Sequence, residues 1–136
     1  MKISAVTWVN EDKLLFLERS DELLSGVNIG GAKLVLVDIA SATNIHSTAV
    51  AATLTPEAVT TDLPALGITT ATSTVVYSNE QTPELTDFKL EGLAILNPNK
   101  VAISNDNDFG IGDFPGATPK VWFIRLADDL PVGHCR

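Results

Sequence analysis

One short segment concentrates oxygen-bearing side chains. Residues 105–113 read NDNDFGIGD, with three aspartates, two asparagines and two glycines. Calcium prefers such carboxylate and amide oxygens and takes about six to eight of them. The segment therefore predicts either a divalent-cation site or a turn whose Asp and Asn side chains bond their own backbone. An EF-hand is excluded, because with Asp106 in the first position Ile111 stands where that loop needs glycine.

Two further places carry candidate groups. Glu18 and Arg19 end an apolar run, and the Arg19 guanidinium could hold a phosphate or carboxylate through two parallel hydrogen bonds. An exposed Glu-Arg pair is the alternative. Glu91 opens a later apolar run, where its carboxylate could reach a metal ion or simply face water. The two histidines and the single cysteine stand apart from any partner base, so no catalytic residue is assigned.

The elements that must position these groups read as strands. Apolar runs of five to eight residues, rich in Val, Ile and Leu and bounded by Asn, Asp, Gly and Pro, predict strands at 3–9, 13–17, 32–39, 92–96, 100–104 and 120–126. Weaker patterns at 46–54 and 72–77 could add strands, and 63–67 could form one helical turn closed by Gly67. The nearly continuous apolar character predicts sheets buried on both faces.

The chain also matches itself at an offset of 87 residues. Asn10 meets Asn97 and Lys13 meets Lys100, and the apolar positions between the identities match as well. The repeated unit is strand, tight turn, strand, glycine-containing loop and strand. The units span about 3–40 and 91–127, with a poorly patterned middle at 41–90.

A unit of this kind is typical of a β-propeller blade, which has four strands in ~40–45 residues. Since the offset is about twice that length, either a degenerate blade or a fourth strand with a long insertion lies between the units. The insertion is favoured because the middle lacks the pattern of a turn followed by a strand. The predicted fold is all-β, with two repeated β-propeller-like blades of a partial propeller. Residues 1–136 are then one domain or a fragment of a larger one.

Composition limits the partners. Nine Lys and Arg against seventeen Asp and Glu give a net charge of −8, which argues against nucleic acid because phosphate binding needs cationic side chains. A hydrophobic content of 45% excludes a disordered chain. No apolar run reaches the ~18–20 residues of a transmembrane helix, and the start of the chain has no secretory signal pattern.

Four motifs in order carry a family resemblance. They are FLERS, KLVLVD, EGLA and NDNDFG, which start at Phe16, Lys33, Glu91 and Asn105. Together they resemble the phytase-like family described by the esterase-like activity of phytase, and this chain is similar to the C-terminal portion of its domain. The resemblance implies hydrolysis of a small phosphate or carboxylic ester, a calcium requirement, and an extracytoplasmic location.

The EGL sequence that starts at Glu91, together with the Asn105-Asp106 pair at a strand end, is also similar to calcium-dependent six-bladed lactonases and paraoxonases. In those proteins Glu, Asn and Asp at the inner ends of strands hold the metal. The similarity implies that Glu91, Asn105, Asp106 and Asp108 are the metal ligands here. By their position in the repeat, Glu18 and Arg19 are the predicted substrate-binding residues.

Two other interpretations stay open. The chain could be a non-catalytic propeller module that binds a partner in a secreted or cell-surface protein, or a shortened chain that folds only when it associates with itself. Self-association is expected in any case, because two blades leave open sheet edges that pair readily with other strands.

Overall fold

The computed structural model describes residues 1–20, 23–24, 27–28, 31–46, 62–79, 89–106 and 118–133. The first sheet has the order β1-β2-β5-β6, and all its pairings are antiparallel: β1 (Lys2–Asn10), β2 (Lys13–Arg19), β5 (Ala32–Asp38) and β6 (Thr72–Ser78). The second sheet is an antiparallel meander of β7 (Leu90–Asn97), β8 (Lys100–Asn105) and β9 (Val121–Arg125). Two short strands, β3 (Leu23–Leu24) and β4 (Val27–Asn28), pair with each other. The all-β prediction is confirmed.

The two sheets repeat each other residue by residue. Every pairing between β7 and β8 has its counterpart 87 positions earlier between β1 and β2, including both register shifts. The pairings of β8 with β9 repeat those of β2 with β5 in the same way. The hairpin turns match as well: Asn10 Oδ1 accepts a hydrogen bond from the amide of Asp12 at 3.0 Å, and Asn97 Oδ1 accepts one from Asn99 at 3.1 Å.

Among the described residues, the first sheet has one strand more than the second. After β5 the chain makes the long connection 39–71 and returns as β6, which pairs with β5. Within the connection, a 3₁₀ turn, Pro64–Leu66, ends at Gly67 with φ 69°. Glycine tolerates this left-handed backbone without a steric penalty. The expected turn at 63–67 and strand at 72–77 are therefore present, whereas residues 47–54 of the other expected strand lie outside the described residues.

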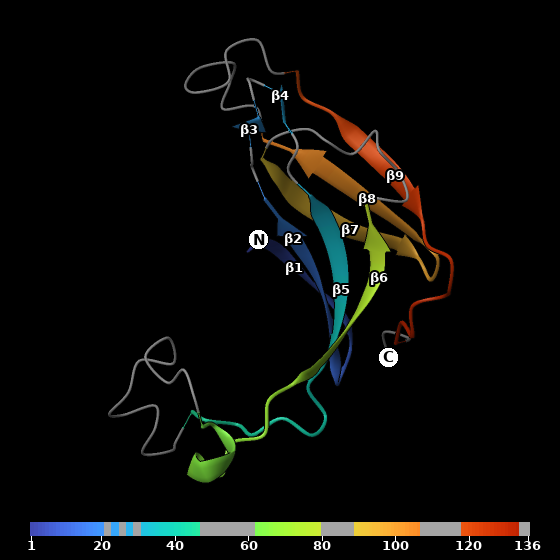
Figure 1. Ribbon diagram of the computed structural model, residues 1–136. Helices are drawn as coiled ribbons and strands as arrows, with labels where there is room; N and C mark the ends of the chain where they lie inside the picture. Colours follow the sequence, from blue (N-terminus) through green and yellow to red (C-terminus); the bar gives the residue numbers. More distant parts are fainter. Residues whose placement is uncertain are drawn as a thin grey trace.

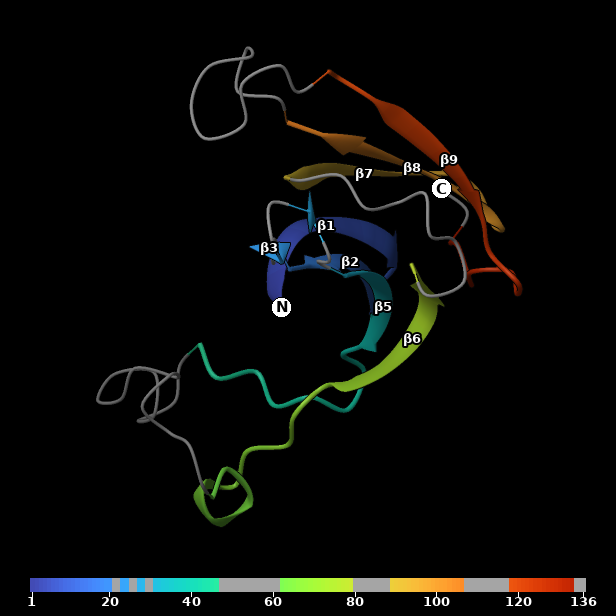
Figure 2. The same ribbon diagram turned by 45° about the horizontal axis from the view of Figure 1, so that its top comes forward.

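The sheets stack face to face around one apolar core (Figures 1 and 2). Successive strand residues point to opposite faces, so each sheet has an inner face toward its neighbour and an outer face. The inner face of the first sheet carries the fully buried Leu15, Leu17 and Leu34. The inner face of the second sheet carries Val101 and Ile103, also fully buried.

Burial on both faces of each sheet was expected, and for the described residues this expectation is wrong. Trp8 on the outer face of the first sheet is 50% exposed, and Phe123 on the outer face of the second is 63% exposed. The sequence pattern looks two-sided because both faces are apolar, but only one face of each sheet meets another sheet in the described part of the chain.

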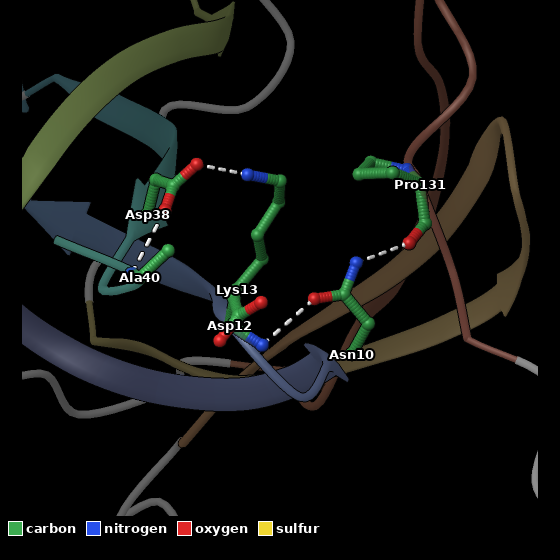
Figure 3. Close-up of polar contacts among 6 residues, drawn as sticks. All are labelled: Asn10, Asp12, Lys13, Asp38, Ala40 and Pro131. Atoms are coloured by element: carbon green, nitrogen blue, oxygen red, sulfur yellow. Dashed lines mark hydrogen bonds and ion pairs between the residues drawn. The ribbon is translucent and has the colours of Figure 1, made fainter.

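The segment after β9 ties the two hairpin turns together. The amide of Leu130 donates to the carbonyl of Pro98 at 2.6 Å, in the turn of the second sheet, and the amide of Gly133 donates to the carbonyl of Val9 at 2.9 Å, in the first sheet. Asn10 Nδ2 also donates to the carbonyl of Pro131 at 2.6 Å (Figure 3). Within the described ranges, no helix has the length and apolar character that crossing a membrane requires.

Candidate functional site

The site residues gather at the end of the sheets away from the hairpin turns, here called the loop end. There β1 and β7 begin, and β2 and β8 finish. Arg19, the last residue of β2, donates from Nη2 to Glu91 Oε1 at 3.0 Å, across the gap between the two sheets. Arg19 is only 5% exposed, whereas Glu91 is 44% exposed. A buried guanidinium is thus held by a carboxylate that reaches water.

A local irregularity aims Glu91 at Arg19. Glu91 lies where the pairing of β7 with β8 shifts register, between Leu90 and Gly92. Such bulges redirect a side chain and are frequent beside functional sites. A Cβ added at Gly92 would collide with Ser104 Oγ on the neighbouring strand, so any larger residue here requires the Ser104 side chain to move. Just before β7, Lys89 has a φ of 51°, which is uncommon for a residue other than glycine.

Arg19 also borders an open hollow of about 320 Å³, lined by Met1, Lys2, Arg19 and Ser20. Two cationic side chains and a hydroxyl meet there. Arg19 has five N–H donors in a fixed, planar fork, a geometry that matches the oxygens of a carboxylate or phosphate group. The hollow is chemically suited to a phosphate or carboxylate group.

The two predicted substrate-binding residues lie on different faces of the first sheet. Glu18 and Arg19 are consecutive on β2, so their side chains point to opposite faces. Arg19 turns inward toward Glu91, whereas Glu18 is on the outer face and pairs in register with Ile3 and Lys33. The structure therefore brings Arg19 together with Lys2 rather than with Glu18.

The predicted metal ligands are partly engaged in other contacts. Asn105 Oδ1 accepts from the amide of Lys120 at 2.7 Å, and its Nδ2 donates to the carbonyl of Thr118 at 3.1 Å. The exposed Asp106 follows β8, and its amide donates to the carbonyl of Lys89 at 2.8 Å. Asp108 lies outside the described residues.

A calcium ion next to Glu91 would have to share that carboxylate with the Arg19 guanidinium. Within the described part of the chain, no group of three or more His, Cys, Asp or Glu side chains is arranged to hold a metal. The ligand set of Glu91, Asn105, Asp106 and Asp108 therefore stays a prediction.

A second hollow, of about 330 Å³, lies at the hairpin end of the first sheet and is lined by Trp8, Asn10, Glu11, Asp12, Lys13, Ala40 and Gly133. Lys13 beside it is neutralised by an ion pair with Asp38 (Figure 3). The hydrogen bond from Lys13 and a further one from the amide of Ala40 lower the pKa of Asp38 below its ordinary value. The lysine at this end is therefore engaged in a structural network, and the other charged residues that line the hollow, Glu11 and Asp12, are acidic.

Sequence reasoning missed Lys2 and the pairing of Arg19 with Glu91. The signal for Lys2 lay in the first hairpin, where Lys2 pairs in register with Arg19. No comparable signal existed for Glu91, because its contact with Arg19 depends on how one sheet stacks on the other.

A family model named Phytase-like, with the description "Esterase-like activity of phytase", matches residues 1–109. Neither the curated proteins nor the solved structures contain a match. The matched stretch includes all of the first sheet, β7 and β8, and both members of the Arg19–Glu91 pair. The chain belongs to the phytase-like family.

Proposed function

We propose that this chain is a phosphoester or ester hydrolase domain, and that the hollow at the loop end holds the anionic part of the substrate. The observation that carries the proposal is the nearly buried Arg19 guanidinium at the wall of an open hollow, next to Lys2 and Ser20. A phosphate group offers several acceptor oxygens, and charge-assisted bonds to Arg and Lys are the strongest that side chains supply. Membership of the phytase-like family supports the same chemistry.

In this proposal Glu91 orients Arg19. A guanidinium held at one nitrogen by a carboxylate has fewer rotamers to lose when it binds an anion, so the fork is organised before the substrate arrives. Lys2 contributes a compact positive charge from the neighbouring strand. The proposal assigns no nucleophile or general base.

We also propose that the two sheets are consecutive blades of a β-propeller. Their shared strand order, shared register at an offset of 87 residues and face-to-face stacking support this arrangement. Propellers repeat four-stranded sheets around an axis. The loop end of both blades would then face the same opening of the propeller.

The experiment is hydrolysis of a chromogenic phosphate monoester and a chromogenic carboxylic ester, each with calcium and with a chelator. Lys2→Gln should lower kcat/KM at least about tenfold for the phosphate, mainly through KM, because it removes one charge-assisted contact. Lys100→Gln, at the hairpin end of the second sheet, is the matched control and should leave kcat/KM unchanged. Equal effects of the two variants would contradict the assignment of the hollow.

Calcium is tested separately by melting. Wild type and Asp106→Ala are compared in calcium and in chelator, since a ligand that binds only the native state raises the melting temperature. A rise in calcium that disappears in Asp106→Ala would support the predicted ligand set. Four equal temperatures would remove calcium from the proposal, and a rise that survives in Asp106→Ala would move the ion to other residues.

A further inference from the structure

The outer faces of the two sheets are apolar and exposed. On the first sheet this face carries Val6 and Trp8, which are about half exposed, with the half-buried Leu14 and Phe16 beside them. On the second sheet it carries Phe123, which is 63% exposed. Contiguous exposed apolar surface of this kind usually marks an interaction site.

The 87-residue repeat identifies what fits each face. The outer-face positions of the first sheet correspond to inner-face positions of the second sheet. The pairs are Val6 with Leu93, Trp8 with Ile95, Leu14 with Val101, Phe16 with Ile103, and Val35, which is buried although it lies on the outer face, with Trp122. All five partners on the second sheet pack in or against the common core. The exposed face of the first sheet is therefore built like the face that the second sheet buries.

The converse holds for the other exposed face. Outer-face positions of the second sheet correspond to inner-face positions of the first: Ala102 to Leu15, Ser104 to Leu17, Val121 to Leu34, and Phe123 to Leu36. Within the chain, the inner face of the first sheet is already stacked on the inner face of the second sheet. The chain thus contains one contact between sheets, formed by its two inner faces. Its two outer faces carry the matching positions for a second contact of the same type.

We propose that two copies of this chain associate head to tail, with the outer face of the first sheet of one copy stacked on the outer face of the second sheet of the other. The contact would continue the stacking seen inside each copy. Because the two faces differ, the contact is heterologous, and it would lead to a ring if its rotation closes or to a growing stack if it does not. The proposal does not depend on hydrolysis.

The test measures mass by light scattering after size exclusion, from about 1 μM to about 200 μM protein. Wild type should rise from the 14.5 kDa of one chain to twice that mass or more. Trp8→Glu and Phe123→Glu, each on one outer face, should both remain monomeric alone. Leu66→Glu is the control, since Leu66 is 47% exposed but lies on the 3₁₀ turn rather than on a sheet face.

Mixing the two face variants makes the test decisive. Each variant keeps one intact face, and the two intact faces are complementary, so an equimolar mixture should form a species of two chains and nothing larger. Far-UV circular dichroism should show that both variants keep their strands. The proposal is overturned if wild type stays monomeric throughout, if either face variant associates as wild type does, or if folded variants fail to combine.

Discussion

The first and second sheets have the same strand order, register and turn, yet they bury opposite faces. Leu17 is fully buried on the first sheet, while its counterpart Ser104 lies on the outer face of the second. Ile103 is fully buried on the second sheet, while its counterpart Phe16 lies on the outer face of the first. Register is thus set within each unit by its turns and bulges, whereas burial is set by the neighbouring sheet.

Replacing a residue by the residue type found 87 positions away should change the stability most where the side chain lies in the core. Leu17→Ser puts the residue of the second sheet into the first, leaves a cavity and buries a hydroxyl, and should lower the free energy of unfolding by about 3–5 kcal/mol. Phe16→Ile, the matched exchange on the outer face, should cost less than about 1.5 kcal/mol. Urea unfolding measures both, and equal costs would show that the two faces do not differ as described.

The next largest loss of stability is expected when the ion pair between Arg19 and Glu91 is broken. Glu91→Gln leaves the buried Arg19 guanidinium facing a neutral amide, which should cost about 1–3 kcal/mol. The lower part of the range is expected, since Glu91 is 44% exposed and water can partly replace the lost charge. Glu11→Gln, on the exposed first turn, is the control and should change the stability little. A negligible cost for Glu91→Gln would mean that the two sheets are held together without this pair.

The two hairpin turns should respond unequally to the same substitution. Asn10 makes the turn bond to Asp12 and a second bond to the carbonyl of Pro131, whereas Asn97 is described with the turn bond to Asn99 alone. At about 0.5–1 kcal/mol for each exposed bond, Asn10→Ala should cost roughly twice as much as Asn97→Ala. Thermal melts of the two variants test this. A larger loss of stability for Asn97→Ala than for Asn10→Ala would show that the bond to the C-terminal segment does not stabilise the chain.

A smaller difference is expected from the paired charges beside those turns. Lys13 opposes Asp38 in the first sheet, but its counterpart Lys100 opposes Arg125 in the second, where two cations face each other. Arg125→Asp would reproduce the first arrangement and should stabilise the chain by about 0.2–1 kcal/mol. A melting temperature below that of wild type would show that Lys100 is better placed over the ring of Phe123, 5.3 Å away.

The smallest expected effect is the loss of stability at low pH that Asp38 causes in the first sheet. The hydrogen bond from Lys13 lowers the pKa of Asp38 in the folded state below its ordinary value of 3.8. Its contribution is therefore complete above pH 3.8 and is lost as the pH falls through the lowered pKa. Asp38→Asn should remove this part of the acid-induced loss, which stability measurements from pH 6 down to pH 2 would show as a flatter curve. An unchanged slope would mean that Asp38 has the same pKa in the unfolded chain.

Much of the fold could be predicted because its signals are local. Asn and Asp between short apolar runs specify both hairpins, and Pro64 with Gly67 specifies the 3₁₀ turn. The choice of buried face could not be predicted, since neighbours such as Phe16 and Leu17 are equally apolar. Candidate site residues could be named one by one from the sequence, but not the contacts between them. Arg19 and Glu91 meet only because the sheets stack, and Glu18 separates from Arg19 because strand residues alternate.

The long connection before β6 has a consequence for how fast the molecule folds. The strands β1, β2 and β5 pair with segments that are close in sequence, and so do β7, β8 and β9. By contrast, β6 can pair with β5 only after the connection 39–71 has closed. Doubling such a loop costs only about 0.6 kcal/mol of closure entropy, but distant pairings slow folding strongly. Changes in the length of this connection should therefore alter the rate at which the fourth strand docks far more than the final stability.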